Sequence, residues 1–210
     1  MGSPGATDSN RRRLVIWSGE DEWRAEACWL DLTQRGVRAE GIQVGVNPLP
    51  YRLDYRLDAS DNFLTSRLDV EVVGEDWSRR LVLMHDGSGN WSATTESRGD
   101  PALSPPGGDM ELVQGALDCD LGLCPLTNLM PVVRHRLHRE PGQRDFLMAW
   151  VSVPDLGVHP SEQRYEHVRL TPSGSVVRYV GAHRDFVGEL EFDENGVVLF
   201  YPGLARRVGG

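Results

Sequence analysis

One stretch of the chain alternates strictly between aromatic or apolar and charged residues: Tyr51-Arg-Leu-Asp-Tyr-Arg-Leu-Asp58. Successive side chains of a β-strand point to opposite faces of its sheet, so this period of two predicts an antiparallel strand with one buried and one wet face. Residues 67–72 repeat the pattern, with Leu68, Val70 and Val72 at alternate positions. Both stretches favour a β fold.

Outside these stretches, runs of β-branched and aromatic residues bounded by turn residues indicate further strands, while helix-period patterns are scarce. The expected strands cover residues 14–18, 24–33, 37–46, 80–85, 91–95, 132–138, 146–153, 165–170, 175–181, 186–193 and 196–201. The pair Asn195-Gly196 is a strong signal for a two-residue hairpin.

An open sheet of about a dozen twisted strands tends to curl or to split into layers, and a curled sheet encloses an interior. The predicted fold class is therefore mainly β, with a single large curled antiparallel sheet, or a partly open barrel, and one or two short helices. A cavity inside such a sheet suits apolar ligands.

The expected organisation is a single domain. Residues 1–12 begin polar and rich in Gly and Ser, which predicts a disordered tail. Residues 13–208 are expected to form one β-roll domain. Residues 99–109, rich in Pro and Gly, predict a flexible surface loop between two β-rich halves of that domain.

Composition excludes several classes of function. The formal net charge of -9 argues against a nucleic-acid partner, because phosphate binding draws on clustered positive charge. All 22 basic residues are Arg, so a Walker-A lysine, a Schiff base and Ser-x-x-Lys acylation are impossible. Gly-x-Ser-x-Gly, His-Glu-x-x-His and Rossmann motifs are also missing. We predict no cofactor.

The chain has three cysteines, and its first residues lack the apolar core of a secretory signal. No window approaches the roughly 18 apolar residues of a membrane span. The expected compartment is the cytoplasm, and no stable membrane insertion is expected. The oligomeric state is left open.

The segment from Asp118 to Arg134 is unusually polar for one set among leucines. On a strand, Asp118 and Asp120 would share a face with their carboxylates roughly 6–7 Å apart. Inverting glycosidases use a similar gap, but their two acids approach the substrate from different elements. Turn and cap hydrogen bonds are the structural interpretation of this pair, and binding of ligand hydroxyl groups is the functional one.

Two further pairs are candidates for the same site. Thr127-Asn128 can cap a helical turn, or Asn128 and Arg134 can point inward and bind a polar head group. An inward Arg134 would need Asp118 or Asp120 as its partner when no ligand is bound. Gln163 and Tyr165 would share one strand face, where they either pack or hydrogen-bond a sugar-like ligand.

The remaining clusters are weaker. Cys119-x4-Cys124 with His135-x2-His138 departs from the spacing of structural zinc sites, and on a strand the two histidines would face opposite sides, so no metal site is predicted. Arg11-Arg-Arg13 and Arg206-Arg207 fit solvated termini or a weak contact with anionic lipid head groups.

Together these residues resemble a bacterial family named "putative glycolipid-binding domain" proteins. The resemblance rests on Tyr51-Arg-x-x-Tyr55, Asp118-x-Asp120-Leu121-x3-Pro125-x-Thr127-Asn128-x2-Pro131-x2-Arg134, Gln163-x-Tyr165 and Asp193-x2-Gly196-x-Val198-x2-Tyr201-Pro202, and spans roughly residues 14–207. The chain departs from the family pattern at Leu129, His135 and Ala205. The resemblance implies a spiral β-roll, similar in fold to lipoprotein carriers, that binds an amphipathic molecule.

The favoured hypothesis is therefore non-enzymatic binding of a lipid or glycolipid-like molecule in the cavity of the curled sheet. Its polar part is expected at a site formed by Asp118, Asp120, Asn128, Arg134, Gln163 and Tyr165. The alternative is a hydrolase or isomerase that acts on a sugar-bearing small molecule through Asp118 or Asp120, with a histidine as proton carrier. A protein-interaction module that uses an exposed strand edge is a third hypothesis.

Overall fold

A computed structural model describes residues 12–182 and 186–210 of the chain. Within these residues fourteen strands form one sheet. Their bounds are β1 Arg13–Gly19, β2 Arg24–Leu32, β3 Val37–Gly45, β4 Tyr51–Ala59, β5 Arg67–Val73, β6 Ser78–His85, β7 Trp91–Arg98, β8 Asp118–Leu121, β9 Gln143–Val151, β10 Val158–Thr171, β11 Gly174–Gly181, β12 Phe186–Asp193, β13 Val198–Tyr201 and β14 Ala205–Gly209.

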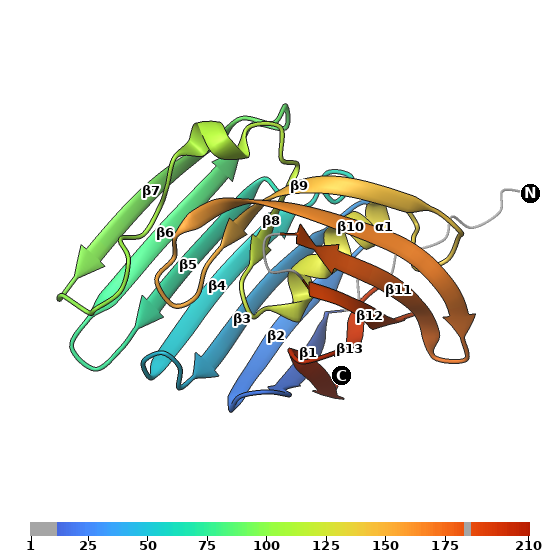
Figure 1. Cartoon of the computed structure of the whole chain (residues 1–210), viewed down its shortest axis with the longest axis horizontal. Coiled ribbons are helices and arrows are strands. Elements are labelled where there is room, and N and C mark those ends of the chain that lie inside the picture. Colours follow the sequence, from blue (N-terminus) through green and yellow to red (C-terminus); the bar gives the residue numbers. More distant parts are fainter. Residues whose placement is uncertain (1–11, 183–185) are drawn as a thin grey trace, which may run out of the picture.

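The sheet is one curled ribbon, which confirms the predicted mainly-β fold (Figure 1). Strands β1 to β7 form one antiparallel meander and β9 to β14 form another. The first strand of the chain pairs with the last, β1 with β14, and this pairing joins the two meanders in the middle of the sheet. Strand β8 ends the order by pairing parallel to β9.

Strand β4 has the conformation that its sequence predicts. Its buried and exposed positions alternate along the whole strand, with Tyr51, Leu53, Tyr55 and Leu57 buried. The same faces of β3, β5 and β6 are buried beside it. Period-two patterning therefore places the interior of the roll correctly in the first half of the chain.

Three short helical elements lie wholly within the described residues: the 3-10 helices η1 Met110–Val113 and η2 Pro125–Asn128, and the α-helix α1 Leu129–Arg134. The strand predicted for residues 132–138 is therefore wrong. Pro131 suits the first helical turn, since its fixed φ is helical and its missing N–H needs no partner there. Leu129, Met130, Pro131 and Val132 are all buried, so this helix is apolar on nearly every side.

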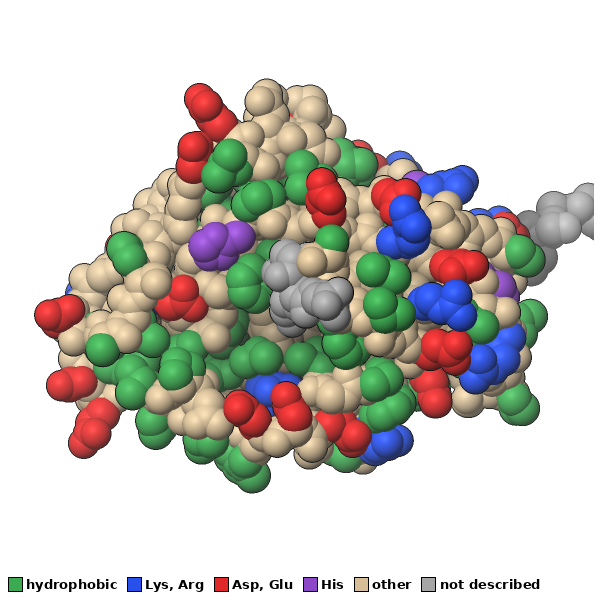
Figure 2. All heavy atoms as spheres, viewed as in Figure 1, with side chains coloured by type: hydrophobic (Ala, Val, Ile, Leu, Met, Phe, Trp, Pro, Cys, Tyr) green, Lys and Arg blue, Asp and Glu red, His purple; other side chains and the backbone are tan. Residues whose placement is uncertain are grey.

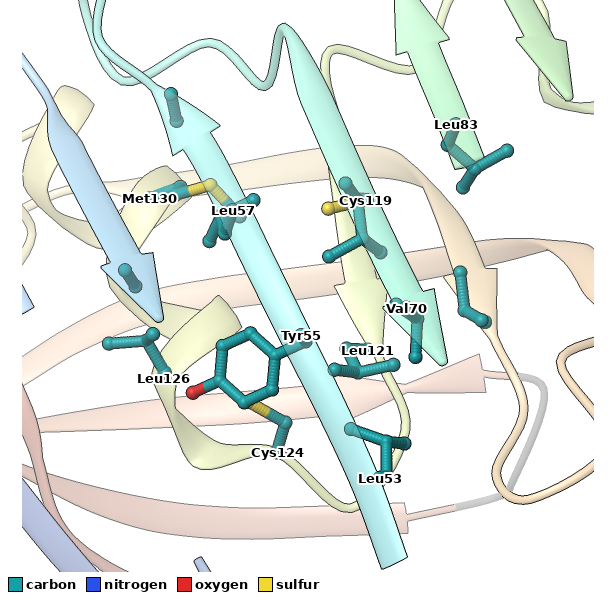
Figure 3. Close-up of a cluster of buried hydrophobic side chains, with 14 of the residues drawn as sticks. Leu53, Tyr55, Leu57, Val70, Leu83, Cys119, Leu121, Cys124, Leu126 and Met130 are labelled. Carbon is teal, nitrogen blue, oxygen red and sulfur yellow. The ribbon is translucent and has the colours of Figure 1, made fainter. Parts of the chain in front are cut away.

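Two buried apolar clusters make up the core. The larger one lies on the first meander and includes residues of β8, η2 and α1, as Figure 3 shows for Tyr55, Leu121, Cys124 and Met130. The second lies on β10 to β13 around Tyr165 and also takes in Val132 of α1. Because the chain from β8 to α1 contributes to both clusters, its side chains fill much of the space that the curled sheet encloses.

The connections agree with part of the predicted organisation. A hairpin does link β12 and β13 at Asn195-Gly196, with Gly196 at a φ of 79°, but four residues separate the two strands instead of the predicted two. In residues 99–109, the carbonyls of Leu103, at 3.2 Å, and of Ser104 accept hydrogen bonds from Arg79. Of the tail predicted for residues 1–12, all but Arg12 lies outside the described residues.

Candidate functional site

Asp118 and Arg134 form a buried ion pair between β8 and the end of α1. Both carboxylate oxygens of Asp118 accept from the guanidinium, at 2.7 and 2.5 Å, and Arg134 also donates to the carbonyl of Phe63 at 3.0 Å. Their side chains are only 1% and 5% exposed. Burial raises the pKa of Asp118, and the hydrogen bonds and charge of Arg134 oppose that rise. Of the two partners predicted for an inward-facing Arg134, Asp118 and Asp120, the structure shows Asp118.

Asp120, two residues further along β8, is held by two different elements. Its Oδ1 accepts from the Thr127 hydroxyl at 2.9 Å, and its Oδ2 accepts from Nε2 of Gln163 at 2.6 Å. Thr127 belongs to η2 and Gln163 to β10, so the carboxylate ties the helical segment to the second meander. All three residues are buried.

Tyr165 extends this network, and its single hydroxyl proton lies between two acceptors, the amide oxygens of Asn128 and Gln163. Its hydroxyl lies 2.8 Å from Oδ1 of Asn128 and 3.0 Å from Oε1 of Gln163. The amide nitrogens of both residues are already donors, from Asn128 to the carbonyl of Pro125 and from Gln163 to Asp120 and Ser161. A phenol has a single O–H, so at any moment it can satisfy only one of the two amide oxygens.

The capping interpretation of Thr127-Asn128 is wrong. Asn128 occupies the N-cap position of α1 but has helical φ and ψ and makes no side-chain cap hydrogen bond. The preceding 3-10 turn already continues into the helix, so no side-chain oxygen is needed to start it. The side chains of Thr127 and Asn128 are free to bind Asp120 and Tyr165 instead.

A second buried polar cluster lies on the first meander, and the sequence analysis did not find it. The Tyr55 hydroxyl and the Cys124 thiol both donate to Oε1 of Glu26, at 2.7 and 3.1 Å. Tyr51 donates to Oε1 of Gln43 at 2.7 Å, and Gln43 donates to the carbonyl of Leu123 at 3.0 Å. The cluster around Glu26 and the network around Asp120 meet at the turn that follows β8, where Cys124 donates to Glu26 and its carbonyl accepts from Thr127.

Glu26 is 3% exposed, and its Oε2 has no hydrogen-bond partner among the residues that the structure describes. Burial raises its pKa to about 7, although the hydrogen bonds from Tyr55, Cys124 and Gln43 and the charge of Arg24 act in the opposite direction. The group therefore titrates near neutral pH. The same burial raises the pKa of Cys28 and of Cys119 to about 12, so these thiols stay protonated at neutral pH.

A small pocket lies beside both clusters. Asp120 and Asn128 line it together with Leu121, Cys124, Trp150, Tyr201 and Leu204. The volume open to the centre of a water molecule is about 10 Å³, which is room for about one water. The elements that carry it lie around the middle of the view in Figure 1, and in the same view Figure 2 shows hydrophobic side chains gathered below the middle.

The structure brings the six predicted residues together in one buried region but gives them different surroundings. Asp120 and Asn128 line the pocket. Gln163 and Tyr165 share the buried face of β10, as predicted, and hold these two residues in place. Asp118 and Arg134 pair with each other and are not among the residues that line this pocket.

The described residues contain no cluster of three or more His, Cys, Asp or Glu side chains that could bind a metal ion. In the same part of the chain, no helix has the length and apolar character needed to span a membrane.

Fold and site together define a class of protein: a single curled β-sheet that encloses a short helical segment carrying buried acids and amides. The chain belongs to the family described as "Putative glycolipid-binding", whose model matches residues 14–207. A crystal structure of a DUF1089 family protein from Pseudomonas aeruginosa is similar to it, with a TM-score of 0.69 and 26% identity, covering 99% of this chain and 98% of that chain. No curated protein matches the chain.

Proposed function

We propose that this protein binds an amphipathic, lipid or glycolipid-like molecule without transforming it. The polar part of the ligand would contact Asp120 and Asn128 in the pocket beside η2. The apolar part would extend along Trp150, Tyr201 and Leu204, which line the same pocket. The family description supports a glycolipid-like ligand at this coarse level.

The observation that carries the proposal is that one pocket is lined both by polar side chains fixed in place, Asp120 and Asn128, and by apolar ones such as Leu204. Asp120 is held by Thr127 and Gln163, and Asn128 by Tyr165, so both pocket-lining side chains are oriented before any ligand arrives. Because the Tyr165 hydroxyl donates to only one of the amide oxygens of Asn128 and Gln163 at a time, the other oxygen can accept from a ligand hydroxyl group. Ligand sites commonly combine a mostly apolar lining with a few oriented polar groups of this kind.

The pocket must widen to admit more than a water molecule. Leu204 and Leu123 lie on turns next to it, and loops yield more easily than paired strands. We infer that the ligand enters by displacing these turn residues while the hydrogen-bonded floor stays in place.

Catalysis on a sugar-bearing molecule is the competing proposal, because Asp120 does line the pocket. Asp118 is poorly placed to act as a second catalytic acid or base, since both of its carboxylate oxygens accept hydrogen bonds from Arg134. The protonated thiols of Cys28 and Cys119 are poor nucleophiles. These features favour binding over chemistry.

Native mass spectrometry of protein purified without detergent from a bacterial extract tests the proposal. We expect an adduct whose mass stays constant during hours of incubation, and Leu204→Trp, which fills the pocket, should remove it. Val208→Trp, at a position of β14 that is 63% exposed, is the matched control and should retain it. An adduct equally present in both variants, or one converted to a product, would contradict the proposal.

A further inference from the structure

Arginines from distant parts of the chain converge on one side of the roll. Arg13 of β1 and Arg207 of β14 both donate to Oδ2 of Asp193, at 3.1 and 2.7 Å. Oδ1 of the same carboxylate accepts from the backbone N–H groups of Asn195 and Val197, both at 2.9 Å. One carboxylate thus faces two guanidinium groups, and a positive charge is left over.

Two adjoining grooves of about 630 and 900 Å³ run past this cluster. Arg13, His138 and Arg139 line both of them, so they form one continuous surface, which we call the arginine groove. Five arginines line it, in a chain whose formal net charge is -9. Two of them, Arg134 and Arg136, are paired with Asp118 and Glu140, and the other three share the groove with the two carboxylates of Asp193 and Glu194. The groove therefore carries one net positive charge on an acidic protein.

Two groups in the arginine groove retain hydrogen-bonding capacity. Arg139 donates to the carbonyl of Glu194 at 3.1 Å and, among the described residues, has no carboxylate within ion-pair distance. His138 is 5% exposed, and its Nδ1 has no hydrogen-bond partner in that same part of the chain. A buried ring nitrogen without a partner is costly unless something occupies the space that it faces.

We propose that the arginine groove binds a phosphate or sulfate group, with the guanidinium of Arg139 and the ring of His138 as its principal ligands and Arg13 and Arg207 as supporting charges. Planar guanidinium groups match such tetrahedral oxyanions with paired hydrogen bonds. The site is separate from the pocket beside η2, so the two proposals stand or fall independently.

The anion can come from a free small molecule or from a lipid head group, and two probes distinguish these sources. Isothermal titration calorimetry with inorganic phosphate, at constant ionic strength set by sodium chloride, tests the free anion. Sedimentation with vesicles of phosphatidylglycerol and phosphatidylcholine, compared with vesicles of phosphatidylcholine alone, tests the head group.

We expect Arg139→Gln to weaken binding of at least one probe by about tenfold, since it removes a charge-assisted hydrogen bond. Arg139→Glu should abolish that binding. Arg98→Gln, at an exposed position on edge strand β7, is the matched control and should bind like the wild type. The proposal is overturned if neither probe binds the wild type, or if Arg98→Gln weakens binding as much as Arg139→Gln does.

Discussion

The ring of Tyr55 occupies the position where a side chain at Gly41 would stand. The two residues are register partners on β4 and β3, and a Cβ built on Gly41 would lie 2.3 Å from Cζ of Tyr55. This absence of a side chain lets the Tyr55 hydroxyl reach Glu26 across the neighbouring strand.

Gly41→Ala should therefore destabilise the protein by about 1–3 kcal/mol, the usual cost of overpacking a core, because the Tyr55 ring must move off its partner. Gly209→Ala is the control, since its Cβ would meet nothing nearer than 3.7 Å. Urea denaturation gives both free energies of unfolding. Equal losses in the two variants would show that the close approach of Gly41 and Tyr55 has no energetic role.

Glu26 predicts a pH dependence whose direction follows from its pKa. The folded value of about 7 lies above the ordinary value of 4.5, so the folded protein holds this proton more tightly than the unfolded chain does. The associated stabilisation is fully present below about pH 4.5 and is lost as the pH rises through 7.

Glu26→Gln stays neutral throughout, so its free energy of unfolding relative to that of the wild type should rise by roughly 2.5 kcal/mol between pH 5 and pH 8. Denaturant titrations at the two pH values measure this difference. Glu96→Gln, at an exposed position of β7, should show no such gain. A gain of the same size in both variants would assign the effect to net charge instead of to the buried site.

Removing one partner of the ion pair of Asp118 and Arg134 should lower the free energy of unfolding much more than replacing both partners with apolar residues. Arg134→Met leaves a buried carboxylate without its partner, and we expect a loss of about 3–5 kcal/mol. Adding Asp118→Leu should restore most of that loss, because the double variant has no unpaired charge. For comparison, Arg38→Met breaks the exposed pair with Asp58 and should cost under about 1 kcal/mol.

The same unfolding experiment on the wild type, Arg134→Met, Asp118→Leu and the double variant decides the point. If the double variant is no more stable than Arg134→Met alone, the pair contributes specific structure beyond charge compensation.

How far the sequence predicts this structure depends on which residues carry the pattern. In β4, charged and apolar residues alternate cleanly, and the strand and its buried face follow directly. In β2, Arg24, Glu26, Cys28 and Leu30 share the buried face, while Trp29 on the other face is 46% exposed. At the start of β2 the buried face carries the charged residues Arg24 and Glu26, so hydrophobicity alone assigns the wrong face to the interior. For this reason the sequence did not predict the cluster around Glu26.

The short elements around the site were also hard to predict. Strand β8 has four residues, all buried, so it shows no alternation, and β14 contains two arginines in five positions. The apolar run at the start of α1 fits a buried helix as well as a strand, and Thr127-Asn128 followed by Pro131 was the local sign of a helical turn. A pairing of Arg134 with Asp118 or Asp120 was predictable, because a buried arginine needs a nearby acid, but the sequence did not say which of the two acids it would be.

The most direct test of the central claim is a chain-length series. Alkyl glucosides that share one head group and differ only in tail length should bind with affinities that rise about fourfold per added methylene, as expected when about 0.8 kcal/mol is gained for each buried CH₂. Thermal shifts at matched concentrations below micelle formation report the affinity. A series in which the melting temperature does not respond to tail length would contradict an amphiphile site inside the curled sheet.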